Sequence, residues 1–321
     1  MKQVAIGIDI GGTNTIFGIV DEQGEFISRG SIKTETHPDH TIFLSALCNS
    51  VGSLIKESKE KIKIVGIGVG APNGNYYNGT IEFAPNLNFK GVVPVVDFMR
   101  NHFGFEITVL TNDANAAAMG EMIYGGAKGM RDFIMITLGT GVGSGIVVNG
   151  EMVYGHDGFA GELGHVIAVP QGRYCGCGRR GCLETYTSAN GIKRTVFELL
   201  ADRLEPSGLR NIGYDDLTAK MIDDAAKRGD VIANRAFDYT GKILGEKLAD
   251  AVAHTSPEAI FLFGGLAQAG KLIFEPTKRY MEESLLNIYK NKVKLLPSKL
   301  PPGDAAILGA SALVWKEYQS K

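Results

Sequence analysis

The sequence predicts an α/β fold of two similar lobes, and two observations carry that prediction. Apolar, β-branched segments alternate along the chain with segments of helical pattern, which is typical of sheets covered by helices. A strand, glycine turn, strand pattern at the N-terminus also recurs between Asp132 and Gly155. Two similar halves facing each other would leave a cleft, where ligands commonly bind. The 321 residues suffice for two lobes of about 150 residues each.

The first half is expected to consist of strands and helices in alternation. Strands are predicted where β-branched residues run between glycines, and helices where apolar residues recur at helical spacing. The expected strands are Val4–Gly11, Thr15–Gly24, Glu25–Ile32, Ile64–Pro72 and Ile107–Asp113, and the expected helices are Asp39–Glu57 and Pro94–His102.

The second half begins with the recurring strand pattern and ends with a helix. A buried strand at Ala259–Gly265 precedes another helix. The final segment begins at Asp304, a suitable N-cap residue, and places Leu308, Ala312 and Trp315 on one helical stripe. We expect this helix to return to the first lobe. Residues 1–120 and 304–321 would then form a smaller N-terminal lobe, and residues 121–303 a larger C-terminal lobe.

Charge and hydropathy disfavour two classes of partner. The 33 basic and 35 acidic residues leave a formal charge of -2, which gives no electrostatic footprint for nucleic acid or for an anionic membrane. The apolar start of the chain is too short to span a bilayer, is broken by Asp9, and does not resemble a secretion signal. We therefore expect a cytoplasmic protein whose partner is a small molecule.

The first candidate site is the glycine turn after the first strand, Asp9-Ile10-Gly11-Gly12-Thr13-Asn14. Its glycines let backbone amides approach a phosphate, Thr13 can donate a hydroxyl hydrogen bond, and Asp9 can hold Mg²⁺ directly or through water. An ordinary hairpin turn has the same composition, so the motif alone leaves both interpretations open. Its spacing is that of neither a Walker A loop nor a Rossmann fingerprint.

The equivalent turn of the second half repeats this composition. Two unrelated turns seldom repeat both the glycines and the threonine, so the repetition favours a pair of phosphate-binding turns. Gly264 and Gly265 follow the strand that ends near residue 263, and without side chains they would let a base or ribose lie against the backbone. A plain strand-to-helix turn has the same pattern. The residues concerned are Gly139, Thr140, Gly141, Gly143, Gly264 and Gly265.

Asn112 and Asp113 lie at the end of a strand that leads into an alanine-rich helical stretch. Phosphoryl transfer to an alcohol needs a carboxylate that accepts the proton of the attacking hydroxyl, and Asp113 can take that role. A residue at this place is also a good helix N-cap. The two roles can belong to different members of the pair.

His165, Cys175, Cys177 and Cys182 are the most specific local signal, because four suitable metal ligands lie within eighteen residues. One imidazole and three thiolates complete the tetrahedral coordination of Zn²⁺ and leave no position for a catalytic water, so the predicted site is structural. It would fix Glu162 and Glu184, which flank the ligands and can accept hydrogen bonds from sugar hydroxyls. The remaining cysteine, Cys48, is expected to be a small buried residue.

These motifs together resemble the ROK family of bacterial sugar kinases, within the actin-like, hexokinase-like ATPase superfamily. The resemblance covers nearly the whole chain: DIGGT at 9–13, TNDANAAAMGE at 111–121, LGTGVGSGI at 138–146, the stretch from GELGH to CGCGRRGCLE at 161–184, and FGG at 263–265. It implies a two-lobed, actin-like ATPase fold, built from a duplicated ribonuclease H-like unit, with a cleft between the lobes and a structural zinc site.

The resemblance also implies roles for individual residues. Asp113 would be the general base, and the two glycine turns, Asp9 and Asn14 included, would surround the phosphates of ATP and their Mg²⁺. The sugar site would be lined by Asn86, Asn112, Asp113, Glu162, His165 and Glu184. Homodimers are common in the family, so one is expected here.

Two residues depart from the family pattern. Asn14 stands where many relatives carry Lys, and Asn73 stands where many carry Gly. Some relatives are repressors with a helix-turn-helix domain before the kinase-like body, and the strand expected at Val4 leaves no room for one.

The predicted activity is transfer of the terminal phosphate of ATP to the 6-hydroxyl of a hexose. Glucose is expected first, with N-acetylglucosamine, mannose and fructose as alternatives. A sugar-binding regulator without turnover is the alternative of another class. An actin-like nucleotide switch is a third, which explains neither the zinc ligands nor the paired glutamates.

Overall fold

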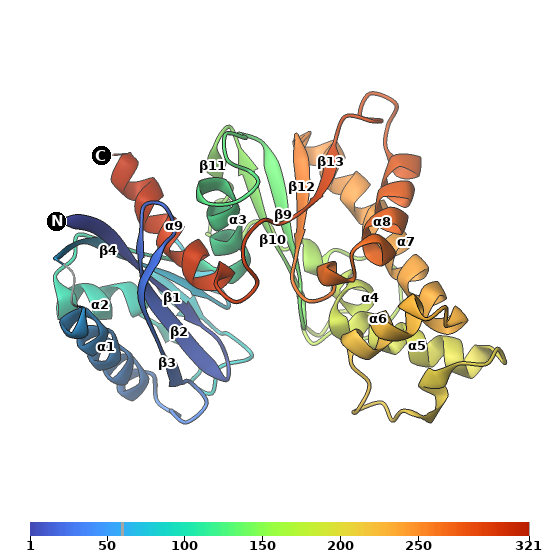
Figure 1. Ribbon diagram of the computed structural model, residues 1–321, viewed down its shortest axis with the longest axis horizontal. Coiled ribbons are helices and arrows are strands. Elements are labelled where there is room, and N and C mark those ends of the chain that lie inside the picture. Colours follow the sequence, from blue (N-terminus) through green and yellow to red (C-terminus); the bar gives the residue numbers. More distant parts are fainter. Residues whose placement is uncertain (59–60, 321) are drawn as a thin grey trace. The chain divides into compact units, whose positions relative to one another are not determined.

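The computed structural model describes residues 1–58 and 61–320 (Figure 1). Contacts divide the chain into two compact units. Unit 1 comprises residues 1–130, 152–160 and 299–321, and unit 2 comprises residues 131–151 and 161–298. The expected boundaries differ from these: residues 121–130, 152–160 and 299–303 belong to unit 1, and the two units are nearly equal in length.

Unit 1 is built on a five-stranded sheet of order β3-β2-β1-β4-β8. β2 pairs antiparallel with β1 and β3, whereas β1, β4 and β8 run parallel. The strands are β1 (Lys2–Ile10), β2 (Asn14–Asp21), β3 (Phe26–Lys33), β4 (Ile62–Ala71) and β8 (Ile107–Asn112). A small antiparallel sheet adds β5 (Gly74–Asn75), β6 (Thr80–Glu82) and β7 (Val92–Val93), which the sequence patterns did not predict.

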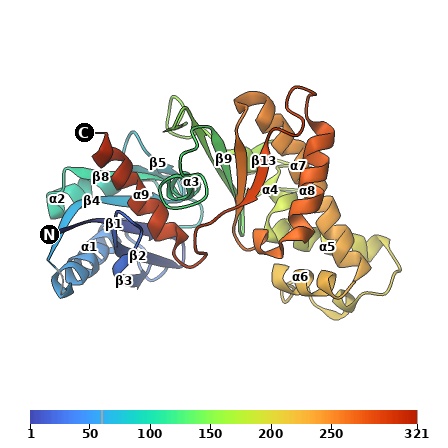
Figure 2. The same cartoon turned by 45° about the horizontal axis from the view of Figure 1, so that its top comes forward.

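Helices cover both faces of this sheet, as the alternation along β1 requires. One face buries Val4, Ile6 and Ile8 against α1 (His40–Glu57) and α2 (Val95–Phe103). The other face receives α9 (Ala305–Gln319), which also packs on α3 (Asp113–Ile123). Gly7 and Gly68 lie against the α9 backbone, where a side chain would collide with it. Figures 1 and 2 show α9 beside α3, which confirms that the last helix returns to the first sheet.

The predicted cap of α9 is corrected by the structure. Asp304 stands at the N-cap position but makes no side-chain capping bond. Its carboxylate instead pairs with the Arg29 guanidinium of β3, at 2.6 and 3.0 Å. In α1 a side-chain cap is present, because Asp39 accepts from the amides of Thr41 and Ile42. The Asp304 side chain therefore ties the helix to the sheet rather than to its own first turn.

Unit 2 repeats the topology of unit 1. Its sheet has the order β11-β10-β9-β12-β13, with β9 and β10 antiparallel and β9, β12 and β13 parallel. Position by position, this order matches β3-β2-β1-β4-β8, so the recurrence seen in the sequence is confirmed. The strands are β9 (Phe133–Leu138), β10 (Val142–Val148), β11 (Glu151–Met152), β12 (Ala259–Phe263) and β13 (Lys294–Pro297).

Helices of unit 2 pack on the apolar residues of β9 and β12. Gly241 and Gly245 of α7 let α8 approach closely, because side chains there would collide with Pro276 and Thr277. The helices are α4 (Glu184–Thr187), α5 (Ala189–Asp202), α6 (Ala219–Lys227), α7 (Val231–Thr255) and α8 (Lys271–Ser284), with short 3₁₀ turns η1 (Leu163–His165), η2 (Gly208–Asn211) and η3 (Ala267–Ala269).

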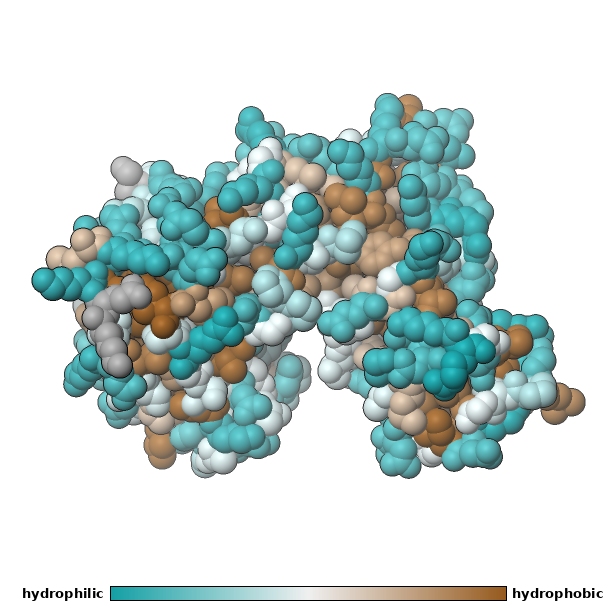
Figure 3. Space-filling model, viewed as in Figure 1, coloured by the Kyte–Doolittle hydropathy of each residue, from teal (hydrophilic) through white to brown (hydrophobic). Residues whose placement is uncertain are grey.

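The hydropathy of the surface is visible on one face of the molecule, and the helices can be checked for length and apolar character. Hydrophilic residues cover most of the face shown in Figure 3. Among residues 1–58 and 61–320, no helix combines the length and the apolar character needed to cross a membrane.

Candidate functional site

In unit 1, two carboxylates lie at the carboxyl ends of parallel strands. Asp9 is at the end of β1 and Asp113 directly follows β8, with β4 between the two strands. The residue of β4 that separates them is Gly70: a methyl group added there would lie 3.6 Å from Asp9 Oδ1 and 3.8 Å from the Asp113 Cα. Ligands of open α/β sheets bind at such strand ends. The sheet therefore brings the predicted metal ligand and the predicted base to one edge.

Asn112 and Asp113 divide two roles that the sequence left open. Asn112 is the N-cap of α3, and its side-chain oxygen accepts from the Ala114 amide at 2.8 Å. Asp113 is the first helical residue, and its Oδ1 accepts from the same amide at 2.8 Å. The second carboxylate oxygen has no capping task, so Asp113 remains available for proton transfer.

Burial raises the pKa of both carboxylates. Desolvation by the surrounding protein, and then the nearby Asp113 charge, raise the pKa of Asp9 to about 7. Desolvation also raises the pKa of Asp113, against hydrogen bonds from its own amide and that of Ala114. The outer surface of Asp113 is nevertheless exposed, so a ligand can reach it. A cation or a substrate hydroxyl would be well placed at such a pair.

The first glycine turn packs tightly against Asn86. A methyl group on Gly12 would come within 2.6 Å of the Asn86 carbonyl oxygen, so only glycine fits there. Thr13 and Asn14 are exposed, and the Thr13 carbonyl accepts from the amides of Thr34 and Glu35. Asn86, predicted to line the sugar site, is thus held beside the predicted phosphate turn.

The second glycine turn has open space around its first glycine. No protein atom lies within 4 Å of a methyl group placed on Gly139, and Thr140 is exposed. Its backbone is held from outside, because Gly139 accepts from the Ala189 amide at 2.8 Å. The turn is therefore rigid yet accessible, as phosphate binding requires.

Glu184 connects this turn with the cysteine cluster. Its Oε2 accepts from the Val142 amide at 3.0 Å and lies against Gly141, and its Oε1 is 3.6 Å from Cys175 Sγ. Ser144, on the same strand as Val142, donates to the Gly161 carbonyl and so ties the strand to the segment that carries Glu162. Glu162 itself is exposed. The predicted link between the metal ligands and the glutamates is present for Glu184.

The four predicted metal ligands converge in unit 2. Their donor atoms all lie within 4.8 Å of one another, with 3.7 Å between the Sγ atoms of Cys177 and Cys182 and 3.8 Å between Cys175 Sγ and His165 Nδ1. Tetrahedral zinc with Zn–S bonds of ~2.3 Å places its ligands about 3.8 Å apart, so the set fits. Burial raises the pKa of the Cys175 thiol to about 12, and a cation would keep it ionised. Cys48 is buried in the core, as expected.

A cavity of about 420 Å³ opens beside the second turn. It runs from Gly139 and Thr140 to the turn after β12, where Gly265 has no atom within 4 Å of an added methyl group. Gly264 is different: its φ of +102° and its contact with Leu138 require glycine for the fold itself. The remaining wall is one face of α6, at Ala219, Lys220, Asp223 and Lys227, with Gln268 and Ala269 opposite. No sequence motif marks this wall, since an amphipathic pattern such as that of α6 indicates a helix with one buried face and no ligand.

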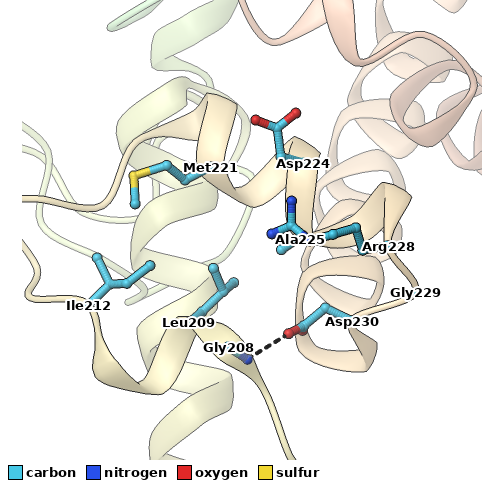
Figure 4. A pocket seen from close by; sticks show the side chains of 9 residues that line it. All are labelled: Gly208, Leu209, Ile212, Met221, Asp224, Ala225, Arg228, Gly229 and Asp230. Carbon is cyan, nitrogen blue, oxygen red and sulfur yellow. Dashed lines mark hydrogen bonds between the residues drawn. The ribbon is translucent and has the colours of Figure 1, made fainter.

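A second cavity of the same volume lies on the other side of α6 (Figure 4). Met221, Ala225 and Leu209 form its apolar part. Asp230 caps α7 through Ala233 and also accepts from the Gly208 amide at 3.1 Å, the bond drawn in Figure 4. Helix α6 therefore separates two cavities and presents a different face to each.

One departure from the family pattern has a structural explanation. Asn73 adopts a left-handed backbone conformation, with φ of +51°, which asparagine tolerates better than most residues other than glycine. Its side chain also donates to the Glu82 carbonyl at 3.0 Å. Asparagine can therefore replace glycine here without a change of fold. The other departure, Asn14, begins β2 and is exposed.

The predicted site residues thus form two groups, one in each unit. Unit 1 brings together Asp9, Gly11, Gly12, Thr13, Asn14, Asn86, Asn112 and Asp113. Unit 2 brings together Gly139, Thr140, Gly141, Gly143, Glu162, His165, Glu184, Gly264 and Gly265 with the three cysteines.

Comparison with known proteins gives one consistent family. The ROK family matches residues 5–317. Glucokinase of Streptomyces coelicolor is 35% identical over 281 residues, which cover 86% of each chain. An N-acetylglucosamine repressor of Escherichia coli is 26% identical over 315 residues, covering 97% of this chain and 75% of the repressor. The crystal structure of a ROK family glucokinase from Streptomyces griseus, in complex with glucose and AMPPNP, is 31% identical with a TM-score of 0.79, covering 98% of this chain and 99% of that one.

Proposed function

The chain belongs to the ROK family, and from that premise we propose that it is an ATP-dependent hexose kinase that phosphorylates the 6-hydroxyl of glucose. The observation that carries the proposal is the pair of carboxylates at the ends of β1 and β8, in which one oxygen of Asp113 accepts from the Ala114 amide and the other takes no part in the helix cap. Relatives named glucokinase span nearly the same length of sequence. A purely structural protein has no need of this pair.

In the proposed reaction, Asp113 accepts the proton of the 6-hydroxyl as its oxygen attacks the γ-phosphorus of ATP. The O6–phosphorus bond forms, the bond from the γ-phosphorus to the bridging oxygen breaks, and ADP leaves. Asn86, Asn112, Glu162, His165 and Glu184 would orient the sugar. These roles remain proposals, supported in unit 1 by the geometry at Gly70 and in unit 2 by the contacts of Glu184.

The nucleotide would be held by both glycine turns. Unit 2 would bind it in the cavity beside Gly139 and Thr140, with Gly265 allowing close approach of the nucleoside. Asp9 would hold Mg²⁺, which neutralises charge on the phosphates when it is bound. The raised pKa of Asp9 supports this role, because a carboxylate beside another carboxylate is stabilised by a cation.

We also propose that His165, Cys175, Cys177 and Cys182 hold a structural zinc ion. All four coordination positions would be filled by protein, so the ion would take no part in the transfer. Its role would be to hold the segment that leads to Glu184, which in turn accepts from the Val142 amide of the second turn. A homodimer and a cytoplasmic location stay predictions.

The test of the function is ADP release against a panel of glucose, N-acetylglucosamine, mannose and fructose. We expect hexose-dependent ADP release, with the highest kcat/KM for glucose. Faster turnover with another hexose would reject glucose as the preferred substrate but would leave the proposed kinase activity in place. Tight sugar binding without ADP release would identify a regulator instead, the second candidate that the similarity to the repressor supports.

A further inference from the structure

Helix α6 supplies four residues to the wall of the proposed nucleotide cavity. These residues are Ala219, Lys220, Asp223 and Lys227. Of the described residues that line this cavity, Asp223 is the single acidic one. The next carboxylate, Asp224, lines the other cavity (Figure 4). It pairs with Lys220. Two adjacent carboxylates on one helix thus face different cavities, which separates their roles.

Asp223 is buried and only half of its carboxylate is satisfied. Its exposed fraction is 7%, and its Oδ2 accepts from Lys227 Nζ at 2.7 Å with Lys220 Nζ at 3.9 Å. Its Oδ1 is buried, and within the described part of the chain no donor reaches it. An unpartnered buried oxygen of this kind destabilises a protein unless a ligand supplies the donor.

A nucleoside carries the donors that this oxygen needs. Adenosine offers the 6-amino group of its base and the 2′- and 3′-hydroxyls of its ribose, and each can donate to a carboxylate. The negative charge of ATP would normally oppose a carboxylate in its own cavity. Lys220 and Lys227 offset that charge, so the acceptor can remain while the repulsion is reduced.

We propose that Asp223 is a specificity residue for the nucleotide, which accepts a hydrogen bond from a donor of the adenosine of ATP. The inference rests on the proposed function in one respect, namely that the cavity beside Gly139 and Thr140 holds the nucleoside. It goes further by naming the residue that selects adenosine. Lys227 acts as a positioning residue, since it orients the carboxylate.

The first experiment needs only the unaltered protein and no turnover. Calorimetric titration compares ATP with ITP, which has an oxo group in place of the 6-amino group, and with 2′-deoxy-ATP and 3′-deoxy-ATP. We expect one of the three analogues to bind about 5- to 100-fold more weakly than ATP, because it lacks the donor that Asp223 accepts. Binding of all four nucleotides within about twofold would overturn the proposal.

The second experiment is the Asp223→Asn variant with Asp224→Asn as its matched control. In the variant, Lys227 would draw the amide oxygen and leave the amide NH₂ facing the nucleoside donor, so discrimination against the critical analogue should be lost. If that analogue is ITP, the NH₂ group should favour its 6-oxo group over the ATP amine. Unchanged discrimination in Asp223→Asn, or an equal loss in Asp224→Asn, would contradict the assignment.

Failure of the function and failure of this inference give different results. Selective nucleotide binding without hexose-dependent ADP release would reject the kinase and keep the role of Asp223. Hexose phosphorylation with equal binding of all four nucleotides would keep the kinase and reject the role of Asp223. Should Asp223→Asn not fold, the titration of the unaltered protein still decides.

Discussion

The two sheets have the same strand order, yet the glycine turns that follow their first strands have different surroundings. In unit 1, Gly12 lies against the Asn86 backbone, where no side chain fits. In unit 2, Gly139 has open space around it and borders a cavity. The first glycine is required by the packing of the protein, whereas the second leaves room for a ligand. A shared motif therefore does not show that its residues have the same role.

The chemistry placed beside each turn differs as well. Unit 1 has two carboxylates, Asp9 and Asp113, whose pKa values are raised by desolvation. Unit 2 has the four predicted metal ligands and the lysines of α6. Under the proposed function, the duplicated topology would serve proton transfer in one unit and nucleotide binding in the other. Each of the following experiments tests one side of this contrast.

The largest effect is expected at Asp113. Asp113→Asn removes the proton acceptor, so kcat for hexose phosphorylation should fall at least about a hundredfold while sugar binding is kept. Steady-state kinetics and sugar titration measure the two quantities. Asp97→Asn, in the first turn of α2 and exposed, is the matched control and should retain full activity. Near-normal turnover of Asp113→Asn would show that Asp113 is not the proton acceptor.

The pH profile tests the same carboxylate. Because desolvation raises the pKa of Asp113 above its ordinary value of 3.8, the base becomes protonated at a higher pH than an exposed aspartate. We expect kcat/KM to fall about tenfold per pH unit on the acid side of that raised pKa. A kcat/KM that stays constant down to pH values near the ordinary pKa would contradict the desolvated environment.

On the side of unit 2, removal of one metal ligand should affect stability more than chemistry. Cys177→Ser should reduce bound zinc from about one ion per chain to none and lower the melting temperature by more than about 5 °C. Elemental analysis and thermal unfolding measure these changes. Cys48→Ser is the control for loss of a thiol and should keep the zinc. A stable, metal-free protein would show that the four ligands need no ion.

The two glycines provide a direct test of the contrast between the turns. Gly12→Ala should cost about 1–3 kcal/mol of unfolding free energy, because the methyl group meets the Asn86 carbonyl. Gly139→Ala should change stability by no more than about 0.5 kcal/mol and instead raise the KM for ATP. Denaturant unfolding and kinetics separate the effects. The reverse pattern would show that the two turns have exchanged roles.

The smallest effect is expected at Asn73. Asn73→Gly relieves a left-handed asparagine but loses the hydrogen bond to the Glu82 carbonyl, so the unfolding free energy should change by less than about 1 kcal/mol. Asn73→Val should be clearly destabilising, since a β-branched residue is strained at this φ. Equal stability of the valine variant would remove the explanation for this departure.

Local patterns predicted most of the strands and the paired turns, because the spacing of apolar residues and the positions of glycines can be read from residues that are close in sequence. The closing helix was also found from its apolar stripe. Its cap was wrong because Asp304 pairs with Arg29, a residue that is distant in sequence. Charge pairs of this kind are set by tertiary packing, which a helix-start pattern does not record.

Site residues could be predicted where they belong to a short sequence motif. They could not be predicted where only the folded chain brings them to the wall of a cavity. The cysteine spacing predicted a set of metal ligands, and the structure brings these four side chains together. Asp223 belongs to an amphipathic helix without a functional motif, and the cavity, its burial and its unpartnered oxygen distinguish it from Asp224. That Asn112 is the N-cap and Asp113 the first helical residue likewise required the helix boundary at the residue level.

The most direct test of the account is the identity of the phosphorylated hydroxyl. The purified protein would be incubated with Mg·ATP and either glucose or 6-deoxyglucose, and the products followed by ³¹P NMR. The account predicts glucose 6-phosphate as the sole sugar phosphate from glucose, and no sugar phosphate from 6-deoxyglucose. Phosphate on another hydroxyl, or phosphorylation of 6-deoxyglucose, would contradict it.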